Sequence, residues 1–312
     1  MYAESFEFNG VDSRDVGICM MDFDGFNNDG VASLGDEVSF ITTRAARSDR
    51  LNFHGHNREQ TMTLNFQIGK DPATAIDMEF SREELAFLKA WLERRDGYHF
   101  LRFFQKGYED TYFYCQIHVE WVRVTGRIVG AELSVTCNAP YGYSGIQGID
   151  VEVPDGGSFI VYNDSDEQGG LEIDQVEIGL KDGSDCTLTL TNHLENIYTL
   201  ADKPDTVAAD TSHATRIYHC NTGEQIVIDG RHHSISTSKS HQSRHTNGSI
   251  CEDFNFHYPR LINISTNLPL LNYIPSNDNY PSYDENRINR FTVTGAHCHV
   301  TLAYRTIRSV MP

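Results

Sequence analysis

Apolar and polar residues alternate along much of the chain, which is the pattern of half-buried β-strands. In Thr61–Ile68 every even-numbered position is apolar, and related runs occur at Tyr98–Phe104, Tyr112–Glu120 and Arg127–Thr136. After residue 150 the runs are shorter and are separated by turn residues, with no segment of helical period. Short strands at such regular spacing are typical of a β-sandwich. The sequence therefore predicts a mainly β fold.

The second half of the chain contains the shorter alternating runs. They are Gly170–Asp174, Val176–Leu180, Cys186–Asn192, Gly223–Gly230, His232–Ser238, Phe254–Ile264, Arg290–Val293 and His299–Arg305. The polar stretches Lys239–Ser249 and 267–289 lack this period, so we expect loops there. The second stretch is long enough to be a surface insertion that contacts another molecule.

One segment of the first half has the period of a helix. Ser81 and Glu84 have the spacing of a capping box, in which each side chain accepts a hydrogen bond from the other residue's backbone N–H. The apolar stripe that follows consists of Leu85, Phe87, Leu88, Trp91 and Leu92. Arg94–Arg95 and then Asp96–Gly97 suit the end of the helix. The sequence predicts a helix at about 81–95, buried along one side.

A tight turn is predicted near the start of the chain. Asn9 and Gly10 follow the alternating residues Phe6–Phe8, and both readily take the positive φ of a two-residue hairpin turn. Val16–Met20 then follows as a second short strand. We expect these two strands to form a hairpin.

The stretch Leu133–Tyr143 separates two differently patterned halves. It begins as a strand and then contains Pro140 and Gly142, which end a strand and turn the chain. At 312 residues the chain is long enough for two domains, each with its own core. We expect an N-terminal β-sandwich-like domain with one helix at 1–145, and a C-terminal β-sandwich domain at 146–312.

The protein is strongly and evenly acidic, with a formal net charge of -19. Residues 1–150 carry 23 acidic and 14 basic side chains, and residues 151–312 carry 21 and 11, which gives -9 and -10. A surface of this sign repels nucleic acid and anionic membranes. No apolar run is long enough to span a bilayer. We therefore expect neither membrane insertion nor specific binding of DNA.

Cysteine spacing and the first residues bear on the cellular compartment. The 7 cysteines include no C-x-x-C pair, which argues against the common zinc and redox motifs. Free cysteines are usually buried, so we expect reduced and mostly buried thiols. The first residues have neither the basic nor the apolar segment of a secretory signal. We expect the protein to be made and folded in a cytoplasm.

A basic island interrupts the acidic first half. Arg44, Arg47, Arg50 and Arg58 lie within about residues 42–59, where acidic residues are few. Two interpretations are open. The segment is either a solvated loop or a projecting arm that docks on an acidic surface, such as that of another copy of this chain.

The sequence has no motif of a familiar catalytic centre, because G-x-S-x-G, a phosphate-binding loop, H-E-x-x-H and a dinucleotide fingerprint are all absent. We expect no enzymatic activity and no cofactor. The candidate metal ligands are His232, His233, His241, His245, Cys251 and His257, with His297, Cys298 and His299 further on. Their spacing is irregular, and alternate residues of a strand share a face for packing as readily as for metal binding. The sequence therefore predicts no catalytic, cofactor-binding or metal-binding residues.

The opening run Phe6–Ile18 resembles the start of the distal tail proteins of siphophages, the phages with long, non-contractile tails. It reads F-E-F-N-G-V-D-S-R-D-V-G-I, and a similar F-x-F-N-G-x-x-S-x-D-x-G-I run opens the chain in that family. The basic arm, with Gly55, lies where the family has its belt hairpin. The predicted helix after Thr61–Ile68 also matches.

The resemblance continues beyond the first domain and covers nearly the whole chain. Pro140–Tyr143 is similar to the family's exit from its first domain. Gly223–Asp229 and Val300–Arg305 are similar to strands of the family's galectin-like second domain. Each segment is a short strand pattern, and it is their shared order and spacing that carries the resemblance.

The resemblance implies a structural protein of the virion, located at the distal end of the tail and assembled in the host cytoplasm. Six copies would close into a homohexameric ring through the first domain, with Arg44, Arg47, Arg50 and Arg58 in its belt. The ring would join the tail tube to the tail tip or baseplate and serve as an assembly hub. DNA would pass through it without specific binding.

The implied partners are the tail tube protein, the tape measure protein and the tail-tip or tail-associated proteins. Receptor-binding proteins or host glycans are implied as ligands of a galectin-like second domain. Tyr258–Arg260 stands where the family has a glycine-rich turn, so sugar binding stays an open question. The alternative function is a soluble carbohydrate-binding, lectin-like module.

Overall fold

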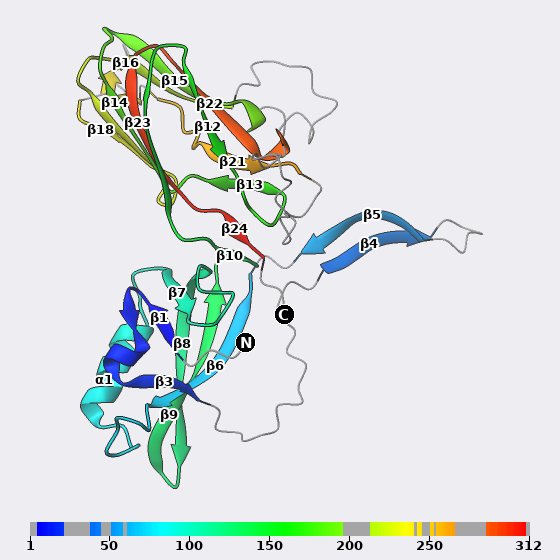
Figure 1. Cartoon of the computed structure of the whole chain (residues 1–312), viewed down its shortest axis with the longest axis vertical. Coiled ribbons are helices and arrows are strands. Elements are labelled where there is room, and N and C mark those ends of the chain that lie inside the picture. The colour runs from blue at the N-terminus through cyan, green and yellow to red at the C-terminus, as the bar shows by residue number, and fades with distance from the viewer. Residues whose placement is uncertain are drawn as a thin grey trace, which may run out of the picture. The chain divides into compact units, whose positions relative to one another are not determined.

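The computed structural model describes residues 5–21, 38–44, 51–58, 61–195, 213–239, 242–244, 250–252, 254–265 and 285–309. The chain divides into two compact units (Figure 1). One unit comprises the residues up to Gly145 together with those from Arg308 onward, and the other comprises Ile146–Ile307. The chain therefore passes between the units twice, because its last residues return to the first unit.

The first unit is built on one nine-stranded sheet. Its strands are β1 (Phe6–Phe8), β2 (Val11–Asp12), β3 (Ile18–Met21), β6 (Thr63–Lys70), β7 (His99–Phe103), β8 (Tyr112–Val124), β9 (Arg127–Cys137), β10 (Gly142–Tyr143) and β24 (Ile307–Arg308). The main path runs β2-β1-β7-β8-β9-β6-β3, and β10 pairs with both β8 and β24. The strand pairs of the main path are antiparallel. A short 3-10 helix, η1 (Ser13–Val16), connects β2 to β3.

Helix α1 (Arg82–Leu92) begins as the sequence predicts and ends earlier. The Ser81 hydroxyl accepts from the Glu84 N–H at 3.2 Å, and a Glu84 carboxylate oxygen accepts from the Ser81 N–H at 2.7 Å. The expected extension of the helix to residue 95 is wrong. Past the helix end the Arg94 side chain donates to the Asp96 carboxylate at 3.0 Å, so this pair belongs to the following loop.

The buried stripe of α1 is narrower than the sequence predicts. Leu88, Trp91 and Leu92 are buried against the sheet, whereas Phe87 is 49% exposed. Successive residues of a helix are about 100° apart, so Phe87 lies to one side of Leu88, at the exposed margin of the buried stripe. Its ring packs instead along that of Trp91, at 6.1 Å between centroids.

Alternate side chains of the sheet form the core of the first unit. Phe6 and Phe8 of β1 are fully buried, as are Phe113 and Cys115 of β8 and Leu133 of β9. Full burial of a phenylalanine or leucine contributes roughly 1.5–3 kcal/mol relative to exposure, so these positions fix which face of each strand turns inward. The period of two that predicted these strands is a direct consequence of that burial.

Two-residue turns set the register of two hairpins in this sheet. Asn9 and Gly10 have φ of 51° and 76°, and Thr125 and Gly126 have φ of 52° and 86°. Positive φ at both central residues is the geometry of a type I′ turn, which matches the twist of the paired strands. The turn predicted at Asn9 and Gly10 is therefore confirmed, although its second strand is the two-residue β2 and not the predicted Val16–Met20.

The second unit contains two larger sheets. The first has the order β11-β23-β14-β17-β18 and the second the order β12-β22-β15-β16. Their strands are β11 (Gln147–Val153), β12 (Ser158–Tyr162), β14 (Gln175–Leu180), β15 (Cys186–Asn192), β16 (Ala214–Cys220), β17 (Gln225–Asp229), β18 (Ser234–Thr237), β22 (Ile288–Thr294) and β23 (Cys298–Tyr304). Two small pairs flank them, β13 (Gly169–Glu172) with β21 (Arg260–Asn263) and β19 (Gln242–Arg244) with β20 (Ile250–Glu252). A 3-10 helix, η2 (Glu285–Arg287), precedes β22.

The two larger sheets share one apolar core, which makes this unit a β-sandwich. Ile178 and Val300 of the first sheet lie in the same buried cluster as Leu190, Phe291 and Val293 of the second. Side chains that alternate inward from both sheets are what such a sandwich requires. The mainly β fold predicted from the sequence is thus present in both units.

Some elements differ from the expectation. The sequence reasoning did not identify β12 and β16, and part of the stretch Lys239–Ser249, expected to be a loop, contributes β19. The expected insertion at 267–289 lies mostly outside the described residues. Among the helices of the described part of the chain, none is long and apolar enough to cross a membrane.

Candidate functional sites

The basic arm forms a hairpin. Its strands β4 (Val38–Arg44) and β5 (Leu51–Arg58) pair antiparallel, with an irregularity in register after Ile41. In the described part of the chain they make a two-stranded sheet of their own (Figure 1). Two-stranded hairpins are marginally stable in water unless they pack against something else.

Two of the four arginines predicted for the belt, Arg44 and Arg58, lie on the described strands of this hairpin. Arg44 pairs with Leu51 at one end of the two described strands, and Arg58 pairs with Val38 at the other end. The backbone thus places these two residues at opposite ends of the hairpin. Arg47 and Arg50 lie outside the described residues.

A groove of about 720 Å³ lies beside α1 in the first unit. Its lining includes the exposed apolar side chains of Ile76 and Phe87. Acidic residues, among them Asp77, Glu79 and Glu83, line the same groove. Exposed apolar side chains beside a concave surface are typical of a protein contact.

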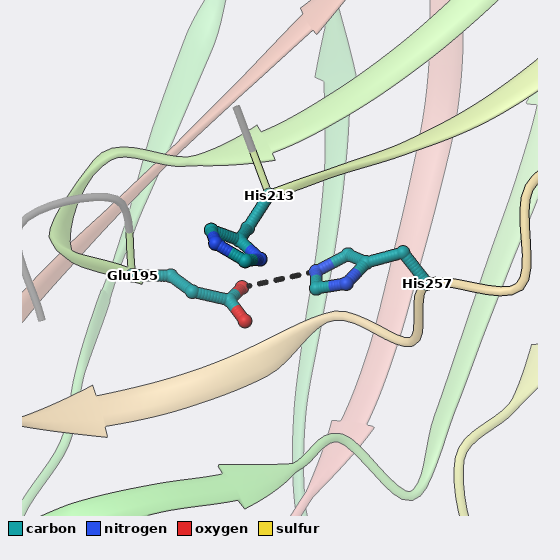
Figure 2. Close-up of side chains that lie close together, drawn as sticks. All are labelled: Glu195, His213 and His257. Carbon is teal, nitrogen blue, oxygen red and sulfur yellow. Dashed lines mark hydrogen bonds and ion pairs between the residues drawn. The ribbon is translucent and has the colours of Figure 1, made fainter. Parts of the chain in front are cut away.

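Three side chains with metal-ligating atoms converge in the second unit: Glu195, His213 and His257 (Figure 2). Glu195 follows β15, His213 directly precedes β16, and His257 lies in the connection that leads into β21. Their ligand atoms lie within 4.8 Å of one another. The Glu195 Oε2 to His257 Nε2 distance is 3.4 Å, and the imidazole centroids of His213 and His257 are 5.6 Å apart.

The carboxylate of Glu195 is buried, with a side-chain exposure of 1%. The Nε atom of Arg260, at the start of β21, donates to Glu195 Oε1 at 2.7 Å. A buried carboxylate needs such a partner, because burying an unpaired charge is costly. Arg260 therefore holds one carboxylate oxygen, and the other oxygen faces the imidazole of His257.

Hydrogen bonds between side chains and the backbone hold His257 beside β16. The Asn255 side chain donates to the Ala214 carbonyl at 2.7 Å and accepts from the Arg216 N–H at 2.6 Å. The Thr215 hydroxyl donates to the carbonyl of His257 at 2.9 Å. The segment that carries His257 is thus fixed against the strand that follows His213.

The histidine group singled out from the sequence does not assemble as one cluster. His232 contacts Asp229 at 2.8 Å and His233 contacts Glu172 at 2.6 Å, both on the surface. His257 is the member of that group that joins the cluster with Glu195. The side chains of the remaining candidates lie outside the described residues: His241, His245 and Cys251.

The other predicted pair of histidines meets a different carboxylate. His297 Nε2 lies 3.4 Å from Glu152, and His299 Nδ1 lies 3.1 Å from the same residue. Lys181 also contacts Glu152 at 3.2 Å. A lysine at the same carboxylate makes this a surface ion-pair network and a poor place for a cation.

The sequence of this chain matches two known protein-domain families. A family described as "Phage tail protein N-terminal domain" matches residues 1–139, and one described as "Phage tail C-terminal domain" matches residues 141–304. The chain belongs to this phage tail protein family. No curated protein matches the chain with significant similarity.

The phage tail protein is also similar to a solved structure, that of the SPP1 Dit (gp 19.1) protein. The two have a TM-score of 0.52 and 11% sequence identity, and the match covers 97% of this chain and 99% of that one. The Dit structure is presented as a paradigm of the hub adsorption apparatus in phages that infect Gram-positive bacteria. The predicted resemblance to distal tail proteins and the mainly β fold of two domains are thereby confirmed.

Sequence reasoning missed two members of the carboxylate–histidine cluster of this tail protein, Glu195 and His213. Both flank the pair β15 and β16, in which Thr191 lies opposite Ala214. Once two antiparallel strands are known to be neighbours, the residue after one and the residue before the other must lie at the same end. Strand β16 was not predicted from the sequence, so His213 could not be placed beside Glu195.

Proposed function

We propose that this phage tail protein is a distal tail protein, of which six copies close into a ring at the end of the tail. The ring joins the tail tube to the tail-tip or baseplate proteins and acts as an assembly hub. The observation that carries the proposal is the likeness in fold to the SPP1 hub protein over 97% of this chain, together with membership of a phage tail family. No enzymatic step is part of this role.

The hairpin β4–β5 supports a contact between copies. A two-stranded hairpin of this length needs another surface for stability. Its arginines carry the opposite sign to the chain as a whole, whose net charge is -19. In the proposed ring each hairpin lies on the neighbouring subunit, in a head-to-tail contact that closes on itself.

The groove beside α1 supports a second contact. Ile76 and Phe87 expose apolar surface there, and burying it would stabilise an assembly by roughly 25 cal/mol per Å² before the costs of association are subtracted. We propose that another tail protein or a neighbouring copy covers this groove in the virion.

The second unit is proposed to face outward and dock other tail proteins, including receptor-binding proteins. A galectin-like sandwich is the proposed type of its fold, and host glycans are a second class of ligand to be tested. DNA passes through the ring without specific binding, because an acidic protein repels a polyanion. The tail tube protein, the tape measure protein and the tail-tip proteins are the proposed neighbours along the tail axis.

Electron microscopy of the purified, untagged chain tests the proposal directly. We expect closed rings with sixfold symmetry, and light-scattering chromatography should give six times the mass of one chain. A protein that stays monomeric at every concentration and at low salt would contradict it. Signals on a glycan array from such a monomer would instead favour the lectin-like alternative.

A further inference from the structure

We propose that Glu195, His213 and His257 bind one zinc ion in the second unit. This site goes beyond the structural role of the protein and does not depend on ring formation. The ligands would be Glu195 Oε2 and one ring nitrogen from each histidine. A water molecule would complete the four-coordinate arrangement that zinc prefers.

The distance between the ligand atoms of Glu195 and His257 fits a zinc site. Zinc bound tetrahedrally, with metal–ligand lengths of about 2.0–2.2 Å, places neighbouring ligand atoms about 3.3–3.6 Å apart. Glu195 Oε2 and His257 Nε2 are 3.4 Å apart. A strong hydrogen bond between them would be shorter, at about 2.7–3.2 Å. All three ligand atoms lie within 4.8 Å of one another, so His213 is close enough to supply the third ligand.

Arg260 compensates the negative charge of the buried Glu195 carboxylate, so the two histidines are not needed for that purpose. Its guanidinium already pairs with Oε1 at 2.7 Å, which neutralises the buried carboxylate. Two imidazoles nevertheless lie beside the same carboxylate (Figure 2). In a zinc site Arg260 would also orient the metal-binding oxygen of Glu195, because a hydrogen bond to one oxygen of a ligating carboxylate fixes the position of the other.

The site is held in place by the strands around it. The Asn255 side chain bonds on both sides of Thr215, and Thr215 itself bonds to the backbone of His257. These contacts fix the backbone of two of the three ligands before any metal binds. Ligands fixed in this way lose less conformational freedom on binding, which favours affinity.

The donor set selects the class of metal. Two imidazole nitrogens and one carboxylate oxygen suit zinc and its neighbours cobalt and nickel, whereas magnesium and calcium prefer oxygen ligands. Glu195 is buried while both histidines are partly exposed, so a metal ion can approach from the histidine side. A bound ion would tie together the end of β15, the start of β16 and the connection into β21.

Zinc and cobalt titrations of the full, untagged chain test the proposal. After treatment with a chelator and removal of the chelator, the protein should bind one equivalent of zinc, measured by calorimetry and elemental analysis. Cobalt in its place should show the intense visible bands of a four-coordinate ion. The melting temperature should rise with zinc concentration, because the ion binds the folded state. Failure to bind zinc above a weak, non-stoichiometric background overturns the proposal.

Variants locate the site. The double variant His213→Gln/His257→Gln should weaken zinc binding at least about tenfold and abolish the cobalt bands. The matched control is His118→Gln/His232→Gln, which removes two histidines that each contact a carboxylate at the surface, and it should bind like the parent. Glu195→Gln, which keeps the shape of the side chain, should weaken binding without unfolding the protein by circular dichroism. Unchanged binding in the first variant would place the zinc elsewhere and overturn the assignment.

Discussion

The indole nitrogen of Trp91 donates a hydrogen bond to the backbone carbonyl of Phe8 at 3.1 Å, although the two residues are 83 positions apart. The same indole stacks on the ring of Phe6 at 5.7 Å. One side chain of α1 is therefore fixed against β1 by both a polar and an apolar contact. Because buried carbonyls need a donor, this hydrogen bond specifies how the helix lies on the sheet.

The first prediction follows from this contact. Trp91→Phe keeps an aromatic ring but leaves the Phe8 carbonyl without this donor, and we expect the free energy of unfolding to fall by about 1–3 kcal/mol. Trp91→Ala also leaves a cavity and should cost about 3–5 kcal/mol. Urea denaturation followed by circular dichroism measures both. The control is Trp121→Phe in a partly buried position, and a loss no larger for Trp91→Phe than for this control would contradict the prediction.

The second prediction concerns the pH dependence of the helix cap. Glu84 accepts from Lys70 Nζ at 2.8 Å and from the Ser81 N–H at 2.7 Å. Burial acts to raise the pKa of Glu84, but the hydrogen bonds from Lys70 and Ser81 outweigh it and the pKa is lowered from its ordinary value of 4.5. Because the pKa of Glu84 is lower in the folded state than in the unfolded chain, ionised Glu84 stabilises the fold. This contribution is fully present above the ordinary pKa of 4.5 and is lost as the pH falls through the lower pKa of the folded state.

Replacing Glu84 by Gln should therefore lower the free energy of unfolding at neutral pH by about 0.5–1 kcal/mol, a small value because the pair is partly exposed. The difference from the parent should shrink as the pH falls below 4.5. Denaturation curves across this pH range measure it, with Glu83→Gln on the same helical turn as the control. A difference that stays constant down to acid pH would show that the charge of Glu84 is not involved.

The third prediction concerns thiol reactivity. Cys115 and Cys137 lie opposite each other on β8 and β9, and both are fully buried. Burial raises the pKa of both thiols, that of Cys137 to about 12, so the reactive thiolate is rare at neutral pH. In the folded protein iodoacetamide should modify the less buried Cys19 well before either of them. Peptide mapping by mass spectrometry measures the order, and equal rates would contradict it.

The parts of the fold that were predictable are those determined by local chemistry. Gly10 takes a positive φ because it has no Cβ, and Asn9 because asparagine tolerates that region. Ser81 and Glu84 form a cap because they are three residues apart. The helix end was mispredicted because Arg94 and Asp96 pair with each other, and Phe87 was misplaced because helical spacing alone does not say how wide the buried face is.

The cluster of Glu195, His213 and His257 could not be predicted from local sequence patterns, because its members are far apart in the chain. Glu195 is 18 positions before His213 in the sequence, and His257 follows a further 44 positions on. Their approach depends on the pairing of β15 with β16 and on the hydrogen bonds of Asn255, which are long-range contacts. Among the described residues of the histidine-rich stretch, His232 and His233 belong to separate surface pairs, with Asp229 and Glu172.

The fourth prediction treats the two units as domains. We propose that the chain at 1–145 and the chain at 146–312 fold around separate cores, with the crossing at Gly145 and Ile146 as the exposed junction. Limited proteolysis should give two stable fragments of similar mass on a denaturing gel. Because β24 pairs with β10, we expect the fragments to stay associated in native buffer. An initial cut within α1 would contradict the proposed domain division.

The last prediction concerns the hairpin β4–β5 in ring assembly. Arg44, Arg47, Arg50 and Arg58 give the hairpin a positive charge, while the chain as a whole carries -19. Copies of so acidic a protein repel one another, and a cationic hairpin on the next subunit offsets that repulsion. Single exposed ion pairs contribute only about 0–1 kcal/mol, so no single arginine is expected to be decisive.

Replacing Arg44, Arg47 and Arg50 together by Glu turns several attractions into repulsions in every interface of the ring. We expect this triple variant to remain folded by circular dichroism and to elute as a monomer in light-scattering chromatography. Added salt should shift the parent toward smaller species, because it screens the same attractions. The matched control is the triple change of the exposed residues Arg82, Arg95 and Arg123 to Glu, which alters the net charge equally within the same unit but outside the hairpin. If the hairpin variant assembles as the control does, the hairpin is a solvated arm, and the sheets of the first unit must hold the ring together.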